Sequence, residues 1–321
     1  MHALTKIEEI IQGVLSGDRR NIAKAITTIE NNTAETQKLI SSIYPHTGKA
    51  HIIGITGPGG SGKSTLIEKI IRKYRQRGKT VGVIAVDPTS PFTGGAFLGD
   101  RIRMQELSTD QGVFIRSMAT RNYRGGIAKA TKDAVKVLDA AGKDIVIVET
   151  VGAGQSEVEI IKVAKTIVVI FAPGLGDEIQ AIKAGMMEIA DIFVVNKADR
   201  ENANKAIMDI QAMLQLNNKE KTWKKPVLKT TALTGEGVPQ LIERIEEHKH
   251  FLERQLEHKR SREKAEAELI EAIKEKVATS MIEKLKREGK FEEFLKKILK
   301  KEMDPTSAAE KLLNEKFRNK V

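Results

Sequence analysis

Residues 51–65 read HIIGITGPGGSGKST, and this stretch decides the fold class. It begins as an apolar, mostly β-branched run, passes through a glycine-rich turn, and leads into the helical pattern STLIEKIIRKYRQ. Residues 57–64, GPGGSGKS, match the spacing G-x-x-x-x-G-K-[ST] of a phosphate-binding loop that joins a strand to a helix. A chance glycine-rich turn is the alternative, but the strand before the loop and the helix after it argue against that.

The segment that follows residue 50 alternates short apolar runs with helical patterns such as NKAIMDIQAMLQL. Most of these runs are apolar at every position, which is typical of parallel strands covered on both faces. Strand, helix and strand in repetition predict a doubly wound α/β domain with a mostly parallel sheet. The expected strands lie within residues 51–57, 80–87, 112–118, 144–150, 166–173, 191–199 and 226–233.

The same patterns divide the chain into three parts: a helical N-terminal extension at 1–48, the phosphate-loop domain at 49–250, and a helical C-terminal region at 251–321. In the first part, Asp18 is expected to cap a helix. In the last part, Asp304 followed by Pro305 is expected to open a helix. An apolar stripe precedes them and either packs in the core or packs on a second copy of the chain; it comprises Ile270, Ile273, Val277, Met281 and Leu285.

Composition limits the function classes. The chain has 321 residues, a net charge of +11 and 0 Cys, so disulfides and thiolate metal sites are excluded. The positive charge permits an anionic partner, but lysines interleaved with glutamates, as in EKLKREGKFEEFLKK, favour solvated helices over a nucleic-acid arm. No apolar run is long enough to span a membrane and no export signal is recognised, so we expect a cytoplasmic protein.

The phosphate loop predicts a nucleotide site. Its glycines let successive backbone N–H groups point at phosphate oxygens, and the following helix adds its positive end. Lys63 is expected to reach the β- and γ-phosphates and act in catalysis, and Ser64 to offer its hydroxyl to Mg²⁺. The residues expected to contact the nucleotide here are Gly57, Pro58, Gly59, Gly60, Ser61, Gly62, Lys63, Ser64 and Thr65.

The stretch NKAD, residues 196–199, predicts which base is bound. An Asp199 carboxylate accepts two hydrogens from the ring N–H and 2-amino group of guanine, and adenine has no such pair to donate. Lys197 would lie along the base and Asn196 would tie the loop together. An ordinary helix cap is the alternative for Asp199. After the next strand, Thr231, Ala232 and Leu233 are expected to contact the guanine oxygen through a backbone N–H, so we expect GTP or GDP.

Hydrolysis of GTP requires Mg²⁺ and a positioned water. Carboxylates at strand ends are the candidate ligands and join Ser64: Asp87, Asp100 and Glu149. Asp87 and Asp100 are also expected to act in catalysis, although each acid can instead cap the next helix. Arg101 and Arg103 are further candidates for neutralising the developing charge.

Several long motifs together resemble one family. ETVG at 149–152 stands where Ras-like proteins carry D-x-x-G, which is similar to the metallochaperone-related branch of P-loop GTPases. Within that branch, DPTSPFTGGAFLGDRIRM, ETVGAGQSE, PGLGDEIQAIKAG and NKAD resemble the methylmalonyl-CoA mutase-associated GTPases of the MeaB/ArgK type. The resemblance covers about residues 5 to 320.

The resemblance implies a GTPase chaperone for an adenosylcobalamin-dependent acyl-CoA mutase, which gates cofactor delivery and protects or reactivates the mutase. It also implies a homodimer formed through the C-terminal helices. Three glycine-containing loops would then act as switches, at residues 88–100, 152–157 and 173–183.

Some residues depart from the family pattern: Asn122 and Arg124 stand where a Gly and a Leu are usual, and Lys225 where a second proline is common. Three other functions remain open. A nickel metallochaperone GTPase is disfavoured, because there is no Cys and His248 and His250 point apart on a helix. A kinase or ATPase linked to amino-acid transport would prefer ATP, and an interaction module would use the nucleotide only as a clamp.

Overall fold

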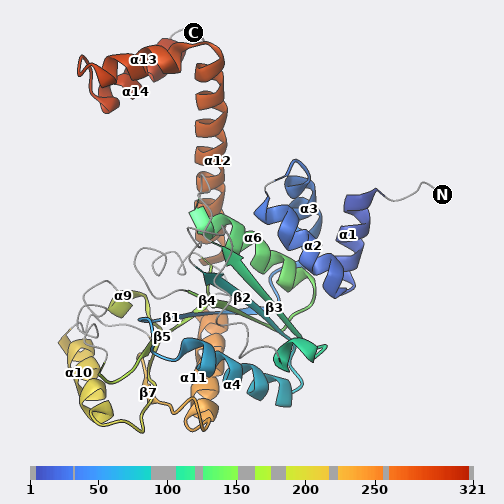
Figure 1. Ribbon diagram of the computed structural model, residues 1–321, viewed down its shortest axis with the longest axis vertical. Coiled ribbons are helices and arrows are strands. Elements are labelled where there is room, and N and C mark those ends of the chain that lie inside the picture. The colour runs from blue at the N-terminus through green and yellow to red at the C-terminus, as the bar shows by residue number, and fades with distance from the viewer. Residues whose placement is uncertain are drawn as a thin grey trace. The chain divides into compact units, whose positions relative to one another are not determined.

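The structure, a computed structural model, describes residues 5–31, 33–87, 106–119, 126–150, 163–174, 186–216, 223–255 and 260–317. The chain forms two compact units, Met1–Arg254 and Gln255–Val321. The first unit contains the sheet together with the N-terminal helices (Figure 1). No helix in the described ranges has the length and apolar character needed to span a membrane.

A seven-stranded sheet forms the centre of the first unit, in the order β3-β2-β4-β1-β5-β6-β7. Every pairing between neighbouring strands is parallel, so the predicted doubly wound α/β fold is confirmed. The seven strands correspond to the seven expected runs: β1 is His51–Thr56, β2 Val81–Asp87, β3 Val113–Ala119, β4 Ile145–Glu149, β5 Thr166–Phe171, β6 Ile192–Val195 and β7 Val227–Lys229.

The strand order reverses at β1, which lies between β4 on one side and β5 on the other. Ligands of open α/β sheets bind outside the carboxyl ends of the strands at such a point. The chain leaves β1 there and enters helix α4, Lys63–Gln76, through residues 57–62. The topology alone therefore places the glycine-rich loop at the position where this class of fold binds its ligands.

Alternate residues of each central strand belong to separate hydrophobic clusters. In β4, Ile145 and Ile147 lie in the cluster that contains the apolar face of α4 and helix α11, Val238–Gln255. Val146 and Val148 lie in the cluster that contains helix α6, Gly126–Ala140, and the N-terminal helices. Because both faces are covered, the strands are apolar throughout and not alternating.

A third cluster covers β5 and β6 on the face opposite α4 and α11. Phe171 and Phe193 stack there with ring centroids 6.3 Å apart. The cluster also contains residues of α9, Met187–Ile189, and α10, Ala203–Leu216. These helices therefore cover this face of β5 and β6.

The N-terminal extension consists of α1, Lys6–Leu15, α2, Arg19–Glu30, α3, Glu35–Ile43, and the short 3-10 helix η1, Tyr44–His46. The predicted cap is confirmed, since the Asp18 carboxylate accepts a hydrogen bond from Asn21 N at 2.8 Å. The apolar faces of the three helices share one hydrophobic cluster with α6 and the sheet. They therefore bury their apolar stripes against α6 and the sheet and do not form a core of their own.

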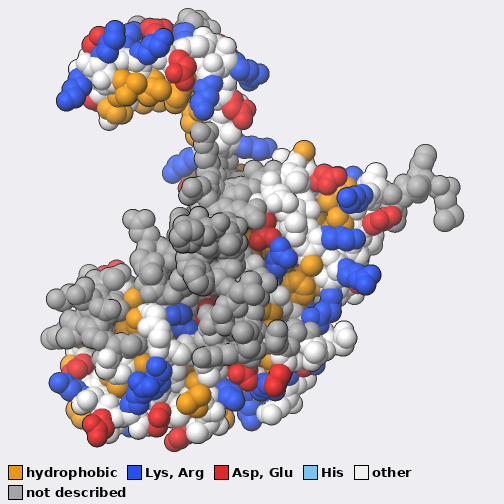
Figure 2. Space-filling view, in the orientation of Figure 1, with side chains coloured by type: hydrophobic (Ala, Val, Ile, Leu, Met, Phe, Trp, Pro, Cys, Tyr) orange, Lys and Arg blue, Asp and Glu red, His pale blue; other side chains and the backbone are white. Residues whose placement is uncertain are grey.

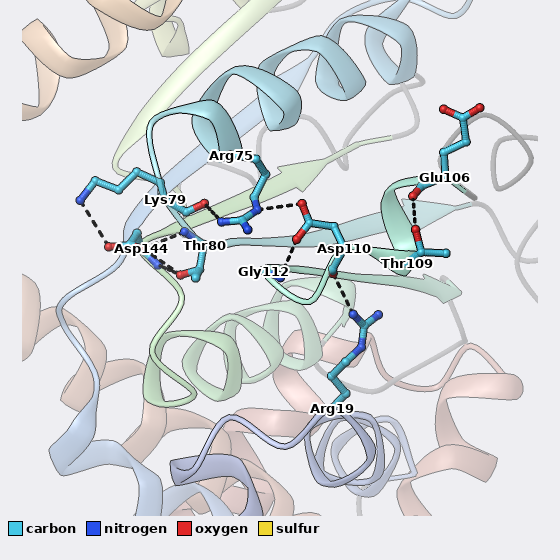
Figure 3. A network of polar contacts seen from close by, with 9 residues as sticks. All are labelled: Arg19, Arg75, Lys79, Thr80, Glu106, Thr109, Asp110, Gly112 and Asp144. Carbon is cyan, nitrogen blue, oxygen red and sulfur yellow. Dashed lines mark hydrogen bonds and ion pairs between the residues drawn. The ribbon is translucent and has the colours of Figure 1, made fainter.

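A polar network at the amino-terminal edge of β2, β3 and β4 joins several of these elements (Figure 3). Its centre is Asp110, which follows the 3-10 helix η3, Glu106–Thr109. The Asp110 carboxylate accepts from Arg75 Nε of α4 at 2.9 Å, and its carbonyl accepts from Arg19 Nη1 of α2 at 2.9 Å. The Arg75 hydrogen bond lowers the pKa of Asp110.

The second unit contains α12, Arg260–Arg287, α13, Lys290–Leu299, and α14, Pro305–Phe317. Gly289 has φ 71°, which only glycine adopts readily, and it separates α12 from α13. The predicted Asp304 cap is confirmed by two hydrogen bonds of 3.0 Å from Thr306 N and Ser307 N. Several apolar side chains of α12 are exposed within this unit: Leu269, Ile270, Ile273, Val277 and Ile282.

Candidate functional site

The glycines of residues 57–62 are required by geometry at two positions. Gly57 has φ 142°, and a Cβ on it would lie 2.0 Å from Ile170 O of β5. Gly62 has φ 88°, and a Cβ on it would lie 2.4 Å from Asn196 Nδ2. Any larger residue at either position would collide with the neighbouring loop or strand, so the close packing of the loop depends on glycine.

Two polar groups of the loop are buried. Lys63 Nζ donates hydrogen bonds to Gly57 O at 2.8 Å and Pro58 O at 3.1 Å. The Ser61 hydroxyl is fully buried and finds no hydrogen-bond partner among the described residues. Buried polar groups are normally paired, and an unpaired one carries a cost in free energy. A phosphate oxygen in the loop would satisfy the Ser61 hydroxyl, which fits the loop to an anionic ligand.

Ser64 and Glu149 meet at the first turn of α4. Ser64 Oγ donates to Glu149 Oε1 at 2.8 Å, and Glu149 is buried at the end of β4. The pair supplies a hydroxyl and a carboxylate oxygen, the donor types that Mg²⁺ prefers. The residues present therefore fit a hard divalent cation. In the described part of the chain, no group of three or more His, Cys, Asp or Glu forms a denser metal site.

The structure describes the other expected metal ligands only in part. Asp87 is the last residue of β2, and the register of Ala85 with Glu149 puts it at the same carboxyl edge as Glu149. The side chain of Asp87 lies outside what the structure describes. Asp100, Arg101 and Arg103 lie outside the described residues, as do most residues of the three expected switch loops.

Asn196 joins three segments of the site. Its Nδ2 donates to Ser61 O of the phosphate loop at 2.8 Å. Its Oδ1 accepts from Thr230 Oγ1 at 3.1 Å and from Ala232 N at 3.0 Å. Sequence reasoning placed Asn196 as a loop tie but did not single out Thr230, whose hydroxyl completes the tie. The signal for it was its position directly after β7, as the first of two consecutive threonines.

Lys197 adds a further link to the loop. It has φ 56°, an uncommon backbone conformation for a residue other than glycine. Its Nζ donates to Gly60 O at 2.7 Å, which draws the long aliphatic stem of Lys197 alongside the phosphate loop. The NKAD stretch and the loop are thus held together by two side chains, Asn196 and Lys197.

Asp199 is exposed beside this framework. Among the described residues nothing donates a hydrogen bond to its carboxylate. Thr231 and Ala232 are buried, whereas the Leu233 side chain is 79% exposed. The structure therefore brings the residues expected to contact the nucleotide base to the same edge as the phosphate loop, and leaves one carboxylate and one apolar side chain open to a ligand.

Lys225, where the family commonly has a proline, has an intramolecular role. Its Nζ donates to Met187 O at 2.8 Å and to Glu188 O at 3.0 Å, both carbonyls of α9. The ammonium thus satisfies backbone acceptors of a very short helix. Asn122 and Arg124, the other departures, lie outside the described residues.

A parallel sheet with G-x-x-x-x-G-K-S at its switch point, and NKAD two strands away, defines a P-loop nucleotide-binding protein. The chain matches the family described as "Methylmalonyl Co-A mutase-associated GTPase MeaB" over residues 22–286 and belongs to it. It is a guanine-nucleotide-binding GTPase, as the sequence predicted.

Individual relatives of this chain carry names that are consistent with this family. A Pyrococcus horikoshii protein named as a GTPase is 53% identical over 312 residues, covering 96% of this chain and 97% of that protein. The "GTPase ArgK" of Escherichia coli is 37% identical over 254 residues, 77% of each chain. A solved structure described as "Crystal structure of LAO/AO transport system kinase" has a TM-score of 0.70 and 25% identity, and the match covers 98% of this chain and 99% of that one.

Proposed function

We propose that the protein is a Mg²⁺-dependent GTPase chaperone of an adenosylcobalamin-dependent acyl-CoA mutase of the methylmalonyl-CoA mutase type. In this function it gates delivery of the intact cofactor and protects or reactivates the mutase. The observation that carries the nucleotide part is the tie of NKAD to the phosphate loop through Asn196 and Lys197. The family description supports the mutase part.

The proposed base contact is the Asp199 carboxylate. It would accept two hydrogens from guanine, while the stem of Lys197 would lie along the ring. The backbone N–H of Leu233 would face the guanine oxygen, since the N–H groups of Thr231 and Ala232 donate to Glu236 O and Asn196 Oδ1. Because Asn196 bonds to Ser61 O as well as to Ala232 N, the base pocket and the phosphate loop keep a fixed separation. A nucleotide of the right length can then reach both without strain.

The proposed phosphate contacts come from the loop and Lys63. Backbone N–H groups of residues 57–64, other than Pro58, and the N-terminal end of α4 would hold the β- and γ-phosphates. The Lys63 ammonium, already turned toward the loop by the carbonyls of Gly57 and Pro58, would neutralise charge that develops on the phosphate oxygens. Asp87 and Asp100 remain proposed contributors to catalysis.

Ser64 and Glu149 are the residues proposed to hold Mg²⁺, with Asp87 and Asp100 as further candidate ligands. The cation would supply charge neutralisation on the β- and γ-phosphate oxygens. The Ser64–Glu149 hydrogen bond of 2.8 Å orients both oxygen donors toward the same end of the loop before any cation binds.

The proposal also includes a homodimer and a cytoplasmic location. The exposed apolar side chains of α12 support the homodimer, because Ile270, Ile273 and Val277 recur at helical spacing on one face. Such a stripe is typical of a helix that packs against another protein surface. Cell fractionation tests the location.

The test is a GTPase assay with and without a cobalamin-dependent mutase from the same cell. We expect GTP turnover to rise when the mutase is added, and a complex to form whose affinity depends on the bound nucleotide. The control is Lys63→Ala with the same mutase, in which stimulated turnover should be lost. No stimulation and no complex would remove the chaperone role and leave the GTPase intact.

A second candidate function is phosphotransfer linked to amino-acid transport, because the solved relative carries the name of a transport system kinase. This function predicts a phosphorylated acceptor in place of free phosphate, with ATP as donor. Measuring free phosphate release from GTP and ATP in the same assay separates the two functions. Release of free phosphate from GTP alone supports the chaperone GTPase.

A further inference from the structure

Two consecutive residues at the end of β4 hold both ends of the phosphate loop. Glu149 Oε1 accepts from Ser64 Oγ at 2.8 Å, which fixes the end of the loop at α4. Thr150 Oγ1 donates to Thr56 Oγ1 at 2.7 Å, which fixes the end of the loop at β1. Thr56 is the residue directly before Gly57, so the loop is bracketed by these two bonds.

The two bonds lie on opposite faces of the sheet. Ile147 belongs to the cluster that contains α4, and Val148 to the cluster that contains α6. Since side chains alternate along a strand, Glu149 points toward α4 and Thr150 points away from it. The strand register pairs Ile55 with Glu149, which brings Thr56 beside Thr150, and Thr150 N also donates to Ile55 O at 3.1 Å.

The Thr56–Thr150 bond is buried, with 0% and 4% of the two residues exposed. Valine has nearly the same shape as threonine and would fill this space without the hydroxyls. Removing one hydroxyl of a buried pair leaves the other unsatisfied, which costs about 1–3 kcal/mol. The pair is not part of the sheet ladder, so its bond adds a constraint on the loop that the sheet itself does not supply.

We infer that Thr56 and Thr150 are a positioning pair for GTP hydrolysis: their bond fixes the phosphate loop relative to Glu149. Binding of GDP depends mainly on the loop and the base pocket. Hydrolysis depends in addition on how the Glu149 carboxylate and the loop N–H groups are placed relative to each other. The inference rests on the proposed roles of the loop and Glu149, and it extends them to two residues outside the proposed nucleotide and metal contacts.

The test compares Thr150→Val with Thr150→Ser, which keeps the hydroxyl and loses only the methyl group. In Thr150→Val we expect kcat for GTP to fall about tenfold, because the variant loses one buried hydrogen bond. The Kd for GDP should stay within about threefold, and the Mg²⁺ concentration for half-maximal rate should rise. Thr150→Ser should recover most of kcat.

The matched control is Thr131→Val in α6. Thr131 is also buried, and its hydroxyl finds no hydrogen-bond partner among the described residues, so the same change removes no bond. We expect kcat and GDP affinity to be unchanged in this variant. A loss of activity there equal to that of Thr150→Val would show that any buried Thr→Val change has this effect, and would overturn the inference.

Thr56→Val and the double variant provide a second route if Thr150→Val folds poorly. If the hydroxyls act as one unit, the double variant should be no slower than either single variant, whereas additive losses would contradict the pairing. An unchanged kcat in Thr150→Val, or no recovery in Thr150→Ser, would also contradict it. If the unaltered protein binds no GDP, the proposed nucleotide site itself fails; normal binding with an unchanged kcat removes only the positioning pair.

Discussion

The proposed base selection depends on a single side chain, the exposed carboxylate of Asp199. In Asp199→Asn the amide presents only one acceptor oxygen and adds an N–H donor opposite a guanine donor. We expect GTP affinity to fall about 10- to 100-fold, because hydrogen bonds to a charged group are lost. Xanthosine triphosphate, which offers a carbonyl to the new N–H, should gain affinity. Competition binding with both nucleotides measures the change.

Glu201→Gln is the control for that variant. Glu201 is an exposed acid two residues further along the same loop. Its neutralisation changes the local charge equally and should leave the GTP to xanthosine triphosphate ratio unaltered. An unchanged ratio in Asp199→Asn would show that the base pocket is assigned to the wrong residues.

His51, at the first position of β1, predicts how stability responds to acid. Its Nε2 lies 2.9 Å from Thr166 Oγ1, and burial lowers its pKa from 6.5 to about 3, with Lys165 and Lys249 adding to the effect. The folded protein keeps His51 neutral, whereas the unfolded chain binds a proton below pH 6.5. Its contribution to stability is therefore present above pH 6.5 and is lost as the pH falls toward 3.

Urea unfolding of the wild type and of His51→Gln at several pH values tests this. Below pH 6.5 the free energy of unfolding of the wild type should fall more steeply, by up to about 1.4 kcal/mol per pH unit. The exposed His46 in η1 is the control, since His46→Gln should keep the wild-type slope. Parallel pH profiles for wild type and His51→Gln would contradict the buried neutral state.

At the residue scale, the sequence predicted the main motifs of the site but not their supporting contacts. Lys63, Ser64, Asn196 and Asp199 were predicted as site residues from spacing, because each motif lies at a strand end that the apolar runs locate. The Thr56–Thr150 bond could not be found that way. It depends on the register between β1 and β4, which lie far apart in the sequence. The sequence of either strand alone does not determine that register.

At the element scale, Asp110 connects α4 to the N-terminal helix α2 (Figure 3). Its carboxylate also accepts from Gly112 N at 2.7 Å, so three groups depend on this residue. In Asp110→Ala both carboxylate bonds are lost and Arg75 loses its ion pair. We expect the free energy of unfolding to fall by about 1–2 kcal/mol in urea denaturation.

Glu106, four residues earlier in η3, provides the matched control. It pairs with Arg72 of α4 at 2.7 Å, but its side chain is 81% exposed. Exposed ion pairs contribute little to the free energy of unfolding, so Glu106→Ala should change it by less than about 0.5 kcal/mol. Equal losses in the two variants would show that burial and the extra bonds of Asp110 do not matter.

Element prediction succeeded where one physical signal dominated. Most strands were recognised because both of their faces are buried, as in β4, β5 and β6, which makes them apolar at nearly every position. The N-terminal helices were recognised from their apolar stripes and the Asp18 cap. What the patterns did not indicate is that these helices share a hydrophobic cluster with α6 and the sheet. An apolar stripe predicts that one face of a helix is buried, but it does not predict which neighbouring element covers that face.

At the scale of the whole molecule, the chain divides into the sheet-containing unit and the C-terminal helical unit. The proposed homodimer depends on the second of these. Figure 2 shows that apolar side chains reach the surface of this unit, and the exposed ones include Ile273 and Val277 of α12, at 52% and 55%. Ile273→Glu with Val277→Glu should convert a dimer to a monomer, because two charges would be buried at the contact.

Light scattering coupled to gel filtration measures the mass of that double variant. Lys274→Glu with Lys276→Glu, a pair of changes at exposed polar positions of the same helix, is the control and should remain dimeric. GDP affinity should be unaffected in both variants, since the proposed nucleotide contacts all come from the first unit. A monomeric wild type, or a dimeric Ile273→Glu, Val277→Glu variant, would contradict dimerisation through this face.

The most direct test of the whole account is calorimetric titration of the purified chain with GTP and with ATP, each in the presence of Mg²⁺. The phosphate loop is indifferent to the base, so in the proposed site the preference comes from Asp199 and the loops that Asn196 holds in place. The account predicts that GTP binds at least about 100-fold more tightly than ATP. A site whose polar groups are positioned to pair with one base rejects a base that leaves them unpaired. Equal affinities for the two nucleotides would contradict it.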